Sequence, residues 1–277
     1  MSLKTILVPL DYSDHSFNAL RIAINLVKQF DARLLLLHSH DVSSSTSMSH
    51  YRGLLDSISD SVKQELMDEL KMASNTFKEL GTMNVDYKVT LGSATEDIQR
   101  TAEEENVDLI VMGTKGRSNR LKQRFGSNSS EISVRAKCSV LVIPAGCDEL
   151  NLDKIVLAAD YHLADELGDL SVLRELSLKN NAEVTILNIT DVPDALNNKE
   201  AQEAMEIHSY LEDVKHKFDQ VTDTDVHNAL LKYAKENANG LIAVTPNKHH
   251  FFHKIFHIGH TEELAMDTSI PMLAIHD

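Results

Sequence analysis

Short apolar runs alternate with longer amphipathic segments through the first half of the chain. The runs are four to six residues long and mostly rich in Val, Ile and Leu, which is typical of strands buried on both faces; they cover 5–9, 33–38, 85–89, 107–112 and 140–143. Segments with apolar residues at helical spacing fill the gaps, at 13–30, 54–80, 96–105 and 129–136. Because strands alternate with helices, the pattern predicts an α/β fold with a parallel sheet covered on both faces.

A second, weaker copy of this pattern begins near residue 153. The stretch 153–161, DKIVLAADY, echoes 4–12, KTILVPLDY, and the 27 residues that separate Gly113 from Val140 also separate Thr245 from Met272. We expect a strand within 153–161, further strands at 183–189, 240–245 and 272–275, and helices at 164–179, 199–218 and 225–236. We therefore interpret the chain as two tandem domains, 1–146 and 147–277.

Composition narrows the classes of function. The chain has 277 residues, is 42% hydrophobic and 25% charged, and carries a formal net charge of −15, which argues against a nucleic-acid surface. No apolar run is long enough to cross a bilayer and no signal-peptide pattern precedes the first strand, so we expect no membrane association and a cytoplasmic location. Cys138 and Cys147 are the only cysteines, which excludes a disulfide framework.

The clearest chemical signal is a glycine pattern after the apolar run at 107–112. It reads Gly113-x-x-Gly116, nine residues, then Gly126-Ser127, and an amphipathic segment follows. Glycine lets the backbone approach a phosphate closely, and the free N–H groups at a helix start bind anions. The alternative is a turn whose glycines only satisfy backbone geometry.

Charge supports the interpretation as an anion site. Five basic residues fall within the glycine loop, namely Lys115, Arg117, Arg120, Lys122 and Arg124. Residues 1–146 as a whole are nearly neutral, with 17 Lys and Arg against 18 Asp and Glu, whereas residues 147–277 carry 10 against 24. A basic loop beside a glycine anion site suits a polyphosphate, although a solvated charged loop has the same composition.

These motifs together resemble a known family. The glycine pattern, the N-terminal Val8-Pro9-Leu10-Asp11-Tyr12-Ser13 and the closing run 139–144 are similar to the ATP-binding branch of the universal stress proteins. The resemblance is strong over 1–146 and weaker beyond. It implies two doubly wound five-stranded parallel sheets with strand order 3-2-1-4-5, the adenine nucleotide alpha hydrolase-like fold. Ligands of such sheets bind where the strand order reverses.

The resemblance also implies a set of ligand-binding residues. Base and ribose would be held by Asp11 and by the backbone of Pro9, Leu10 and Ser39, with Met112 and Gly113 facing the ribose. The phosphates would be held by Gly116, Gly126, Ser127, Asn128 and Ser129, with added charge from Lys115 or Arg117. The expected ligand is ATP, with ADP or AMP and an accompanying Mg²⁺ as open alternatives. No catalytic residue or metal-binding residue is assigned, and slow ATP hydrolysis is the most that the motifs support.

The second copy lacks the glycines. Thr245 and Lys248 stand where Gly113 and Gly116 stand in the first, although Asp160 corresponds to Asp11. A loop with bulky side chains cannot wrap a phosphate as a glycine loop can. We therefore expect one nucleotide site, in the first domain, and a degenerate second domain.

Several alternatives remain beside this hypothesis. The chain can be a nucleotide-independent scaffold that binds protein partners through its acidic second domain, or a transferase that uses a bound adenylate. A run of histidines at 249–260 has spacing that suits a metal site or a solvated surface, and its His-Ile-Gly-His at 257–260 lies outside the strand-to-helix context that nucleotidyltransferases require.

The family resemblance also implies how the domains assemble. Members dimerise by pairing their fifth strands, so we expect 140–143 and 272–275 to pair antiparallel within this chain as an intrachain pseudo-dimer. That pairing would cover two exposed sheet edges. A further homodimer is an additional expectation.

Overall fold

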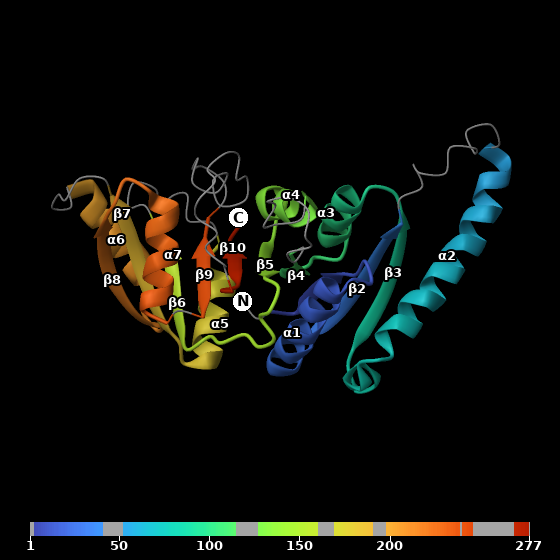
Figure 1. The fold of residues 1–277 in the computed structure, drawn as a ribbon, viewed down its shortest axis with the longest axis horizontal. Helices are drawn as coiled ribbons and strands as arrows, with labels where there is room; N and C mark the ends of the chain where they lie inside the picture. Colours follow the sequence, from blue (N-terminus) through green and yellow to red (C-terminus); the bar gives the residue numbers. More distant parts are fainter. Residues whose placement is uncertain are drawn as a thin grey trace.

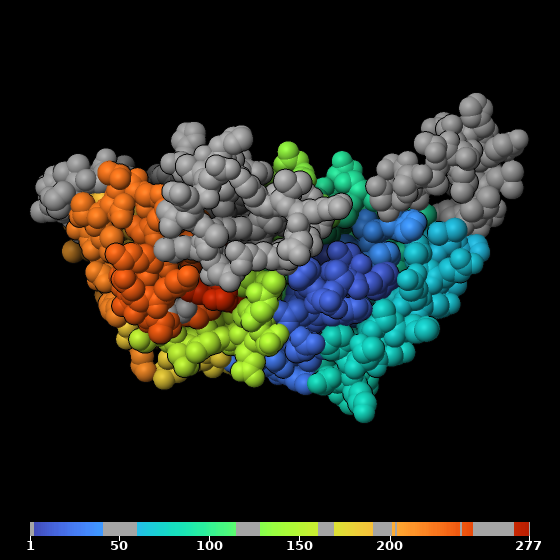
Figure 2. Space-filling model, viewed as in Figure 1, coloured from blue at the N-terminus to red at the C-terminus, as the bar shows by residue number. Residues whose placement is uncertain are grey.

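The structure is a computed structural model of the chain. Of the 277 residues, it describes 3–40, 52–114, 127–159, 169–190, 198–238, 240–245 and 269–276. One twisted sheet runs through the whole molecule with helices on both faces, which confirms the predicted α/β class (Figure 1). In the space-filling view the blue-to-green first half and the yellow-to-orange second half lie side by side (Figure 2).

The first half contributes five parallel strands, and their order confirms the predicted 3-2-1-4-5 arrangement. The sheet runs β3-β2-β1-β4-β5 at this end. The strands are β1 (Thr5–Pro9), β2 (Arg33–His40), β3 (Val85–Leu91), β4 (Leu109–Gly113) and β5 (Ser139–Ile143). The register begins with Thr5 opposite Arg33 and Ile6 opposite Leu109, so β1 lies between β2 and β4.

The second half repeats this order in the other part of the sheet, as β10-β9-β6-β7-β8. Its strands are β6 (Lys154–Ala158), β7 (Glu183–Thr190), β8 (Lys215–Thr222), β9 (Leu241–Val244) and β10 (Met272–Ala274). The helix predicted over 199–218 is wrong in its last part. It ends at Tyr210, and β8 follows as a parallel edge strand on β7.

Equivalent positions in the two halves can be read from their backbone. The helices that precede β2 and β7 both end in a left-handed residue, Asp31 with φ 54° and Asn181 with φ 53°. Arg33 and Glu183, each two residues further on, open the two strands. One constant sequence offset, which takes Asp31 to Asn181 and Arg33 to Glu183, therefore relates the two halves in this region.

The two halves join through one antiparallel pair of strands. β10 runs antiparallel to β5, with Met272 opposite Val142, Leu273 opposite Leu141 and Ala274 opposite Val140. The segments predicted to pair do pair, and the described strands form a single ten-stranded sheet. At a sheet edge the backbone N–H and C=O groups of a strand have no partners. Here the two strands provide partners for each other.

Seven α-helices in the described part of the chain cover the sheet. They are α1 (Asp14–Phe30), α2 (Arg52–Ser74), α3 (Ala94–Glu104), α4 (Ser127–Arg135), α5 (Ser171–Asn180), α6 (Asn198–Tyr210) and α7 (Val226–Glu236). The core has two layers because strand side chains alternate between faces. Ile6 and Val8 pack with α1, α5 and α6 in one cluster, whereas Leu7 packs with α3, α4 and α7 in the other.

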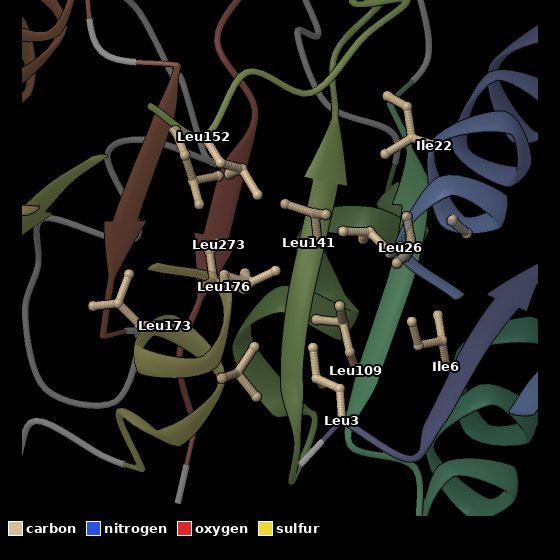
Figure 3. Close-up of a cluster of buried hydrophobic side chains, with 14 of the residues drawn as sticks. Leu3, Ile6, Ile22, Leu26, Leu109, Leu141, Leu152, Leu173, Leu176 and Leu273 are labelled. Carbon is tan, nitrogen blue, oxygen red and sulfur yellow. The ribbon is translucent and has the colours of Figure 1, made fainter. Parts of the chain in front are cut away.

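Figure 3 shows the first of these clusters crossing the join between the halves. Leu141 on β5 and Leu273 on β10 lie on neighbouring strands, with Leu176 of α5 close to Leu273. All three side chains are fully buried. The two halves thus share one continuous hydrophobic layer rather than meeting only through backbone hydrogen bonds.

The single long helix predicted over 54–80 is also wrong in its last part. α2 ends at Ser74, and a short 3₁₀ helix, Lys78–Thr82, follows. Ser74 Oγ donates to the carbonyl of Lys71 and Thr76 Oγ1 to that of Ala73. Hydroxyl groups that bond to nearby carbonyls compete with the helical ladder, and helices often end at such residues.

Candidate functional site

The sheet reverses its strand order between β1 and β4. These strands are parallel neighbours, so their carboxyl ends, at Pro9 and Gly113, lie at the same edge of the sheet. After β1 the chain enters α1 on one face, and the next described helix after β4 is α4 on the other face. In open α/β sheets, ligands bind outside the carboxyl ends of the strands at such a point of divergence.

The first turn of α1 brings the two sequence motifs together. A Cβ atom built on Gly113 would lie 2.7 Å from the carbonyl carbon of His15 and still closer to its oxygen. His15 is four residues after Asp11. Only a residue without a side chain allows this approach, so Gly113 has a packing role that the phosphate argument did not foresee.

Gly113→Ala is expected to destabilise the protein by about 1–3 kcal/mol, because the added methyl group must displace the α1 backbone. Gly81→Ala is the matched control, since a Cβ there meets nothing within 4 Å. It should be neutral or slightly stabilising. Urea unfolding of both variants measures the difference, and equal midpoints would show that the α1 contact does not require glycine.

Asp11 is an exposed carboxylate just beyond β1. Its Oδ1 accepts hydrogen bonds from the backbone N–H of Ser13 at 3.1 Å and from the Ser13 hydroxyl at 2.6 Å. Partial burial raises the pKa of Asp11, but hydrogen bonds from Ser13, together with those from the Ser16 side chain and the Asp11 backbone, outweigh that effect and hold the pKa below its ordinary value of 3.8. The carboxylate is therefore fully ionised at neutral pH.

Ser13→Ala is expected to raise the pKa of Asp11, because one of the donors that favour the charged form is lost while the desolvation remains. A depressed folded-state pKa stabilises the fold above the unfolded pKa of about 3.9, and this contribution disappears as pH falls through the folded value. In the variant, the stability of the fold should therefore depend less steeply on pH in the acid range. Carboxyl NMR titration tests it, and an unchanged or lower Asp11 pKa would refute the assignment to Ser13.

Leu10, between Pro9 and Asp11, has both backbone groups paired within the protein. Its N–H donates to the carbonyl of Leu37 at 2.8 Å, and its carbonyl lies 2.8 Å from Nδ1 of His38. The buried His38 ring also stacks on Tyr12, with ring centroids 4.6 Å apart. His38 thus has a structural role at the end of β2, and a ligand can use only the second lone pair of the Leu10 carbonyl.

Ser39 leads to a residue that sequence reasoning did not connect with the site. Its hydroxyl donates to Oδ2 of Asp97 at 2.6 Å, and Arg100 contacts the other Asp97 oxygen. Asp97 is buried, and a Cβ on Gly92 would lie 3.2 Å from its carboxylate. Only the positions of these residues along the chain could have predicted the contact. Ser39 lies at the end of β2, and Asp97 lies in the first turn of the helix that follows β3. This carboxylate fixes the Ser39 side chain at the crevice edge.

The remaining predicted residues divide between described and undescribed parts of the chain. Pro9 ends β1 half-buried and Met112 is buried within β4. Lys115, Gly116 and Gly126 lie outside the described residues. The basic residues predicted from Arg117 to Arg124 lie outside them as well.

The predicted helix after the glycine loop begins two residues earlier than expected, at Ser127. Ser127 and Asn128 are therefore in the first turn of α4, Asn128 is exposed, and Ser129 is buried. The first N–H groups of a helix have no partners within the helix and carry partial positive charge. The N-terminus of α4 supplies the kind of group that the phosphate prediction requires.

The second half has the same backbone but different side chains at this place. The N–H of Ala159 donates to the carbonyl of Leu187, as the N–H of Leu10 does to that of Leu37. The strand register places Thr245, just after β9, at the position that Gly113 has at the end of β4. Its predicted counterparts of the site residues, Asp160, Lys248 and Gly259, lie outside the described residues. Within the described part, no side chain of the second half corresponds to Asp11.

Metal clusters and membrane spans are both absent from the described residues. No described group of three or more His, Cys, Asp or Glu side chains is placed to hold a metal ion. The histidine run at 249–260 lies outside the described residues. Among the described helices, none is both long and apolar enough to span a bilayer.

Comparison with known proteins points to one family. The model of the universal stress protein family matches residues 2–144. A universal stress protein of Methanocaldococcus jannaschii is 33% identical over 140 residues, which is 50% of this chain and 81% of that protein. One of Bacillus subtilis is 30% identical over 142 residues, which is 50% of this chain and 96% of that protein.

Two solved structures match over nearly the full length. A universal stress protein from Archaeoglobus fulgidus covers 99% of this chain, with 97% of its own chain matched, a TM-score of 0.65 and 18% identity. A functionally unknown protein from Pseudomonas aeruginosa covers 99%, with 92% of its own chain matched, a TM-score of 0.59 and 14% identity. At such low identity these structures establish the fold alone, and they do so for both halves.

Proposed function

The chain belongs to the universal stress protein family, and from this premise we propose that its first half binds ATP in the crevice between the carboxyl ends of β1 and β4. The observation that carries the proposal is the convergence of Asp11 and Gly113. Two motifs that are distant in the sequence meet at the place where the strand order reverses. Such crevices are the ligand sites of doubly wound sheets.

Asp11 is proposed to hold the ribose. Its carboxylate is exposed, ionised at neutral pH and oriented by the two Ser13 hydrogen bonds. A fixed carboxylate is a strong acceptor for sugar hydroxyls, and hydrogen bonds to charged groups are worth about 1.5–3 kcal/mol each. The Pro9, Leu10 and Ser39 backbone at the same edge is proposed to line the base, with Met112 and Gly113 opposite the ribose.

The triphosphate is proposed to lie over the N-terminus of α4. The N–H groups near Ser127, Asn128 and Ser129 would bind phosphate oxygens, and Lys115, Gly116 and Gly126 of the preceding loop would complete the cradle. If Mg²⁺ accompanies the nucleotide, its ligands would come mainly from phosphate oxygens and water. The chemistry that the ion supplies is neutralisation of phosphate charge.

Binding rather than catalysis is the proposed activity. Efficient phosphoryl transfer needs an oriented nucleophile as well as a metal. Asp11 is proposed to hold the ribose, and the buried Asp97 carboxylate at the same edge is bonded to Ser39 and Arg100. We therefore propose a nucleotide-dependent regulatory role in stress response. The occupied state would be read by partner proteins, with hydrolysis slow or absent.

Mass spectrometry of small molecules released from the purified, denatured protein tests this proposal. An adenine nucleotide at up to one equivalent per chain is expected, with much less released from Asp11→Ala. Titration of the emptied protein with ATP, ADP and AMP then ranks the three ligands. Failure of all three to bind at millimolar concentration would overturn the proposal.

A further inference from the structure

Two histidines of the second half lie against each other at the outer end of the sheet. His208 is in the last turn of α6 and His216 is the second residue of β8. Nδ1 of His208 is 2.8 Å from Nε2 of His216, and the ring centroids are 4.9 Å apart. His208 is exposed and His216 half-buried, so the pair lies at the protein surface.

A third contact sets the protonation of the pair. Nδ1 of His216 lies 2.8 Å from the carbonyl oxygen of Val214. A carbonyl only accepts, so Nδ1 of His216 carries the proton and Nε2 presents its lone pair toward His208. Donation of the far ring N–H to a backbone carbonyl is the arrangement that orients histidines bound to metals and raises their basicity.

The first half shows that the fold does not need this pair. Val85 pairs with Leu34 in β3 and β2, and His216 pairs with Val184 in β8 and β7. Leu34 and Val184 each follow the first residue of their strand, so they are equivalent and His216 occupies the place of Val85. Val85 packs against the hydrophobic core under α2. The second half has replaced an apolar contact with an imidazole pair.

The surroundings favour a cation. The second half carries 10 Lys and Arg against 24 Asp and Glu, which lowers the cost of bringing positive charge to its surface. Lys215 and Lys217 flank His216 on the strand, and the alternation of strand side chains puts both on the opposite face, where Lys217 pairs with Glu183 at 2.7 Å. The Phe218 ring lies nearly perpendicular to the His216 ring, with ring centroids 5.9 Å apart, and closes one side of the pair.

We propose that His208 and His216 form a binding site for a divalent transition-metal ion of the Ni²⁺, Cu²⁺ and Zn²⁺ group. Two imidazole nitrogens would hold the ion, and water would complete its coordination shell. Among the described residues, no third His, Cys, Asp or Glu side chain is placed to join the pair. Metal–nitrogen bonds of about 2.0–2.1 Å put the two nitrogens roughly 3.3 Å apart in a tetrahedral site. In the present contact Nδ1–H of His208 donates to Nε2 of His216, so metal binding would move the His208 proton to its own Nε2 and turn that exposed ring to open the 2.8 Å separation.

Such a site would clamp the end of α6 to the edge strand β8. An ion that binds only the folded state stabilises it in proportion to the logarithm of its concentration over the dissociation constant. Affinity should follow the order Ni²⁺ < Cu²⁺ > Zn²⁺ that nitrogen ligands give. The site is separate from the proposed nucleotide crevice, which is in the other half of the sheet.

The test uses the full-length chain without an affinity tag and without nucleotide, titrated with Cu²⁺, Ni²⁺ and Zn²⁺. Zn²⁺ should shift the amide resonances of His208, His216 and Phe218. His216→Gln and His208→Gln should each weaken binding at this site at least tenfold. His253→Gln, in the histidine run at 249–260, is the matched control and should leave the response of these resonances unchanged.

Two results would overturn the proposal. One is the absence of any resonance change at His208 and His216 at millimolar Zn²⁺. The other is that His208→Gln and His216→Gln both keep the metal affinity and stoichiometry of the unchanged protein, whereas His253→Gln lowers them. Circular dichroism confirms that each variant is folded, so that a loss of binding cannot be attributed to unfolding.

Discussion

Replacing Asp11 with alanine is expected to raise the dissociation constant for ATP by about tenfold to a hundredfold. The variant removes an ionised, preoriented acceptor at the carboxyl end of β1, and a hydrogen bond to a charged group is worth about 1.5–3 kcal/mol. Each factor of ten in affinity corresponds to about 1.4 kcal/mol, so that loss gives this range. Isothermal titration of the emptied protein with ATP measures it.

Asp169→Ala is the matched control for this experiment. Asp169 accepts hydrogen bonds from the backbone and the hydroxyl of Ser171, both at 2.8 Å, just as Asp11 does from Ser13. It precedes α5 in the second half, so its loss disturbs a similar turn without touching the proposed site. Equal ATP affinities for the two variants would remove Asp11 from the site.

Leu273→Ala is expected to destabilise the chain by about 2–5 kcal/mol, the range for truncating a buried leucine to alanine. Leu273 is fully buried, sits opposite Leu141 and belongs to the layer that both halves share (Figure 3). Because β10 joins the two half-sheets, the loss should lower the unfolding midpoint of the whole chain. Urea unfolding followed by circular dichroism measures the change.

Leu178→Ala is the control with the same chemical change. Leu178 lies on α5 and is 41% exposed, so its truncation should cost about 0.5 kcal/mol or less. If both variants unfold at the same urea concentration, the shared layer does not stabilise the protein as described.

Most of the first half of the fold is predictable from its apolar runs. The strands at β1, β4 and β5 are buried on both faces, so continuous apolar sequence marks them directly. β8 escapes prediction for the opposite reason. It is an edge strand that is largely exposed, and its sequence, KHKFDQVT, has neither an apolar run nor a clear alternation. Because this sequence carries no strand pattern and comes soon after a helix, it is predicted as a continuation of that helix.

The candidate site is predictable only where the chemistry lies in short motifs. Asp11 and Gly113 each stand out at the end of an apolar strand, and the parallel topology brings them to one edge. The packing of Gly113 on the His15 backbone depends on how α1 crosses β4, which no local pattern encodes. The contact between Ser39 and Asp97 likewise joins residues 58 apart.

A single nucleotide site in the first half, at the reversal between β1 and β4, is tested most directly by amide chemical-shift mapping during an ATP titration. The largest shifts should fall at Asp11, Gly113 and the start of α4, with the amides of Ala159 and Thr245 unmoved. Shifts concentrated at Ala159 and Thr245, with Asp11 and Gly113 unaffected, would contradict a site in the first half.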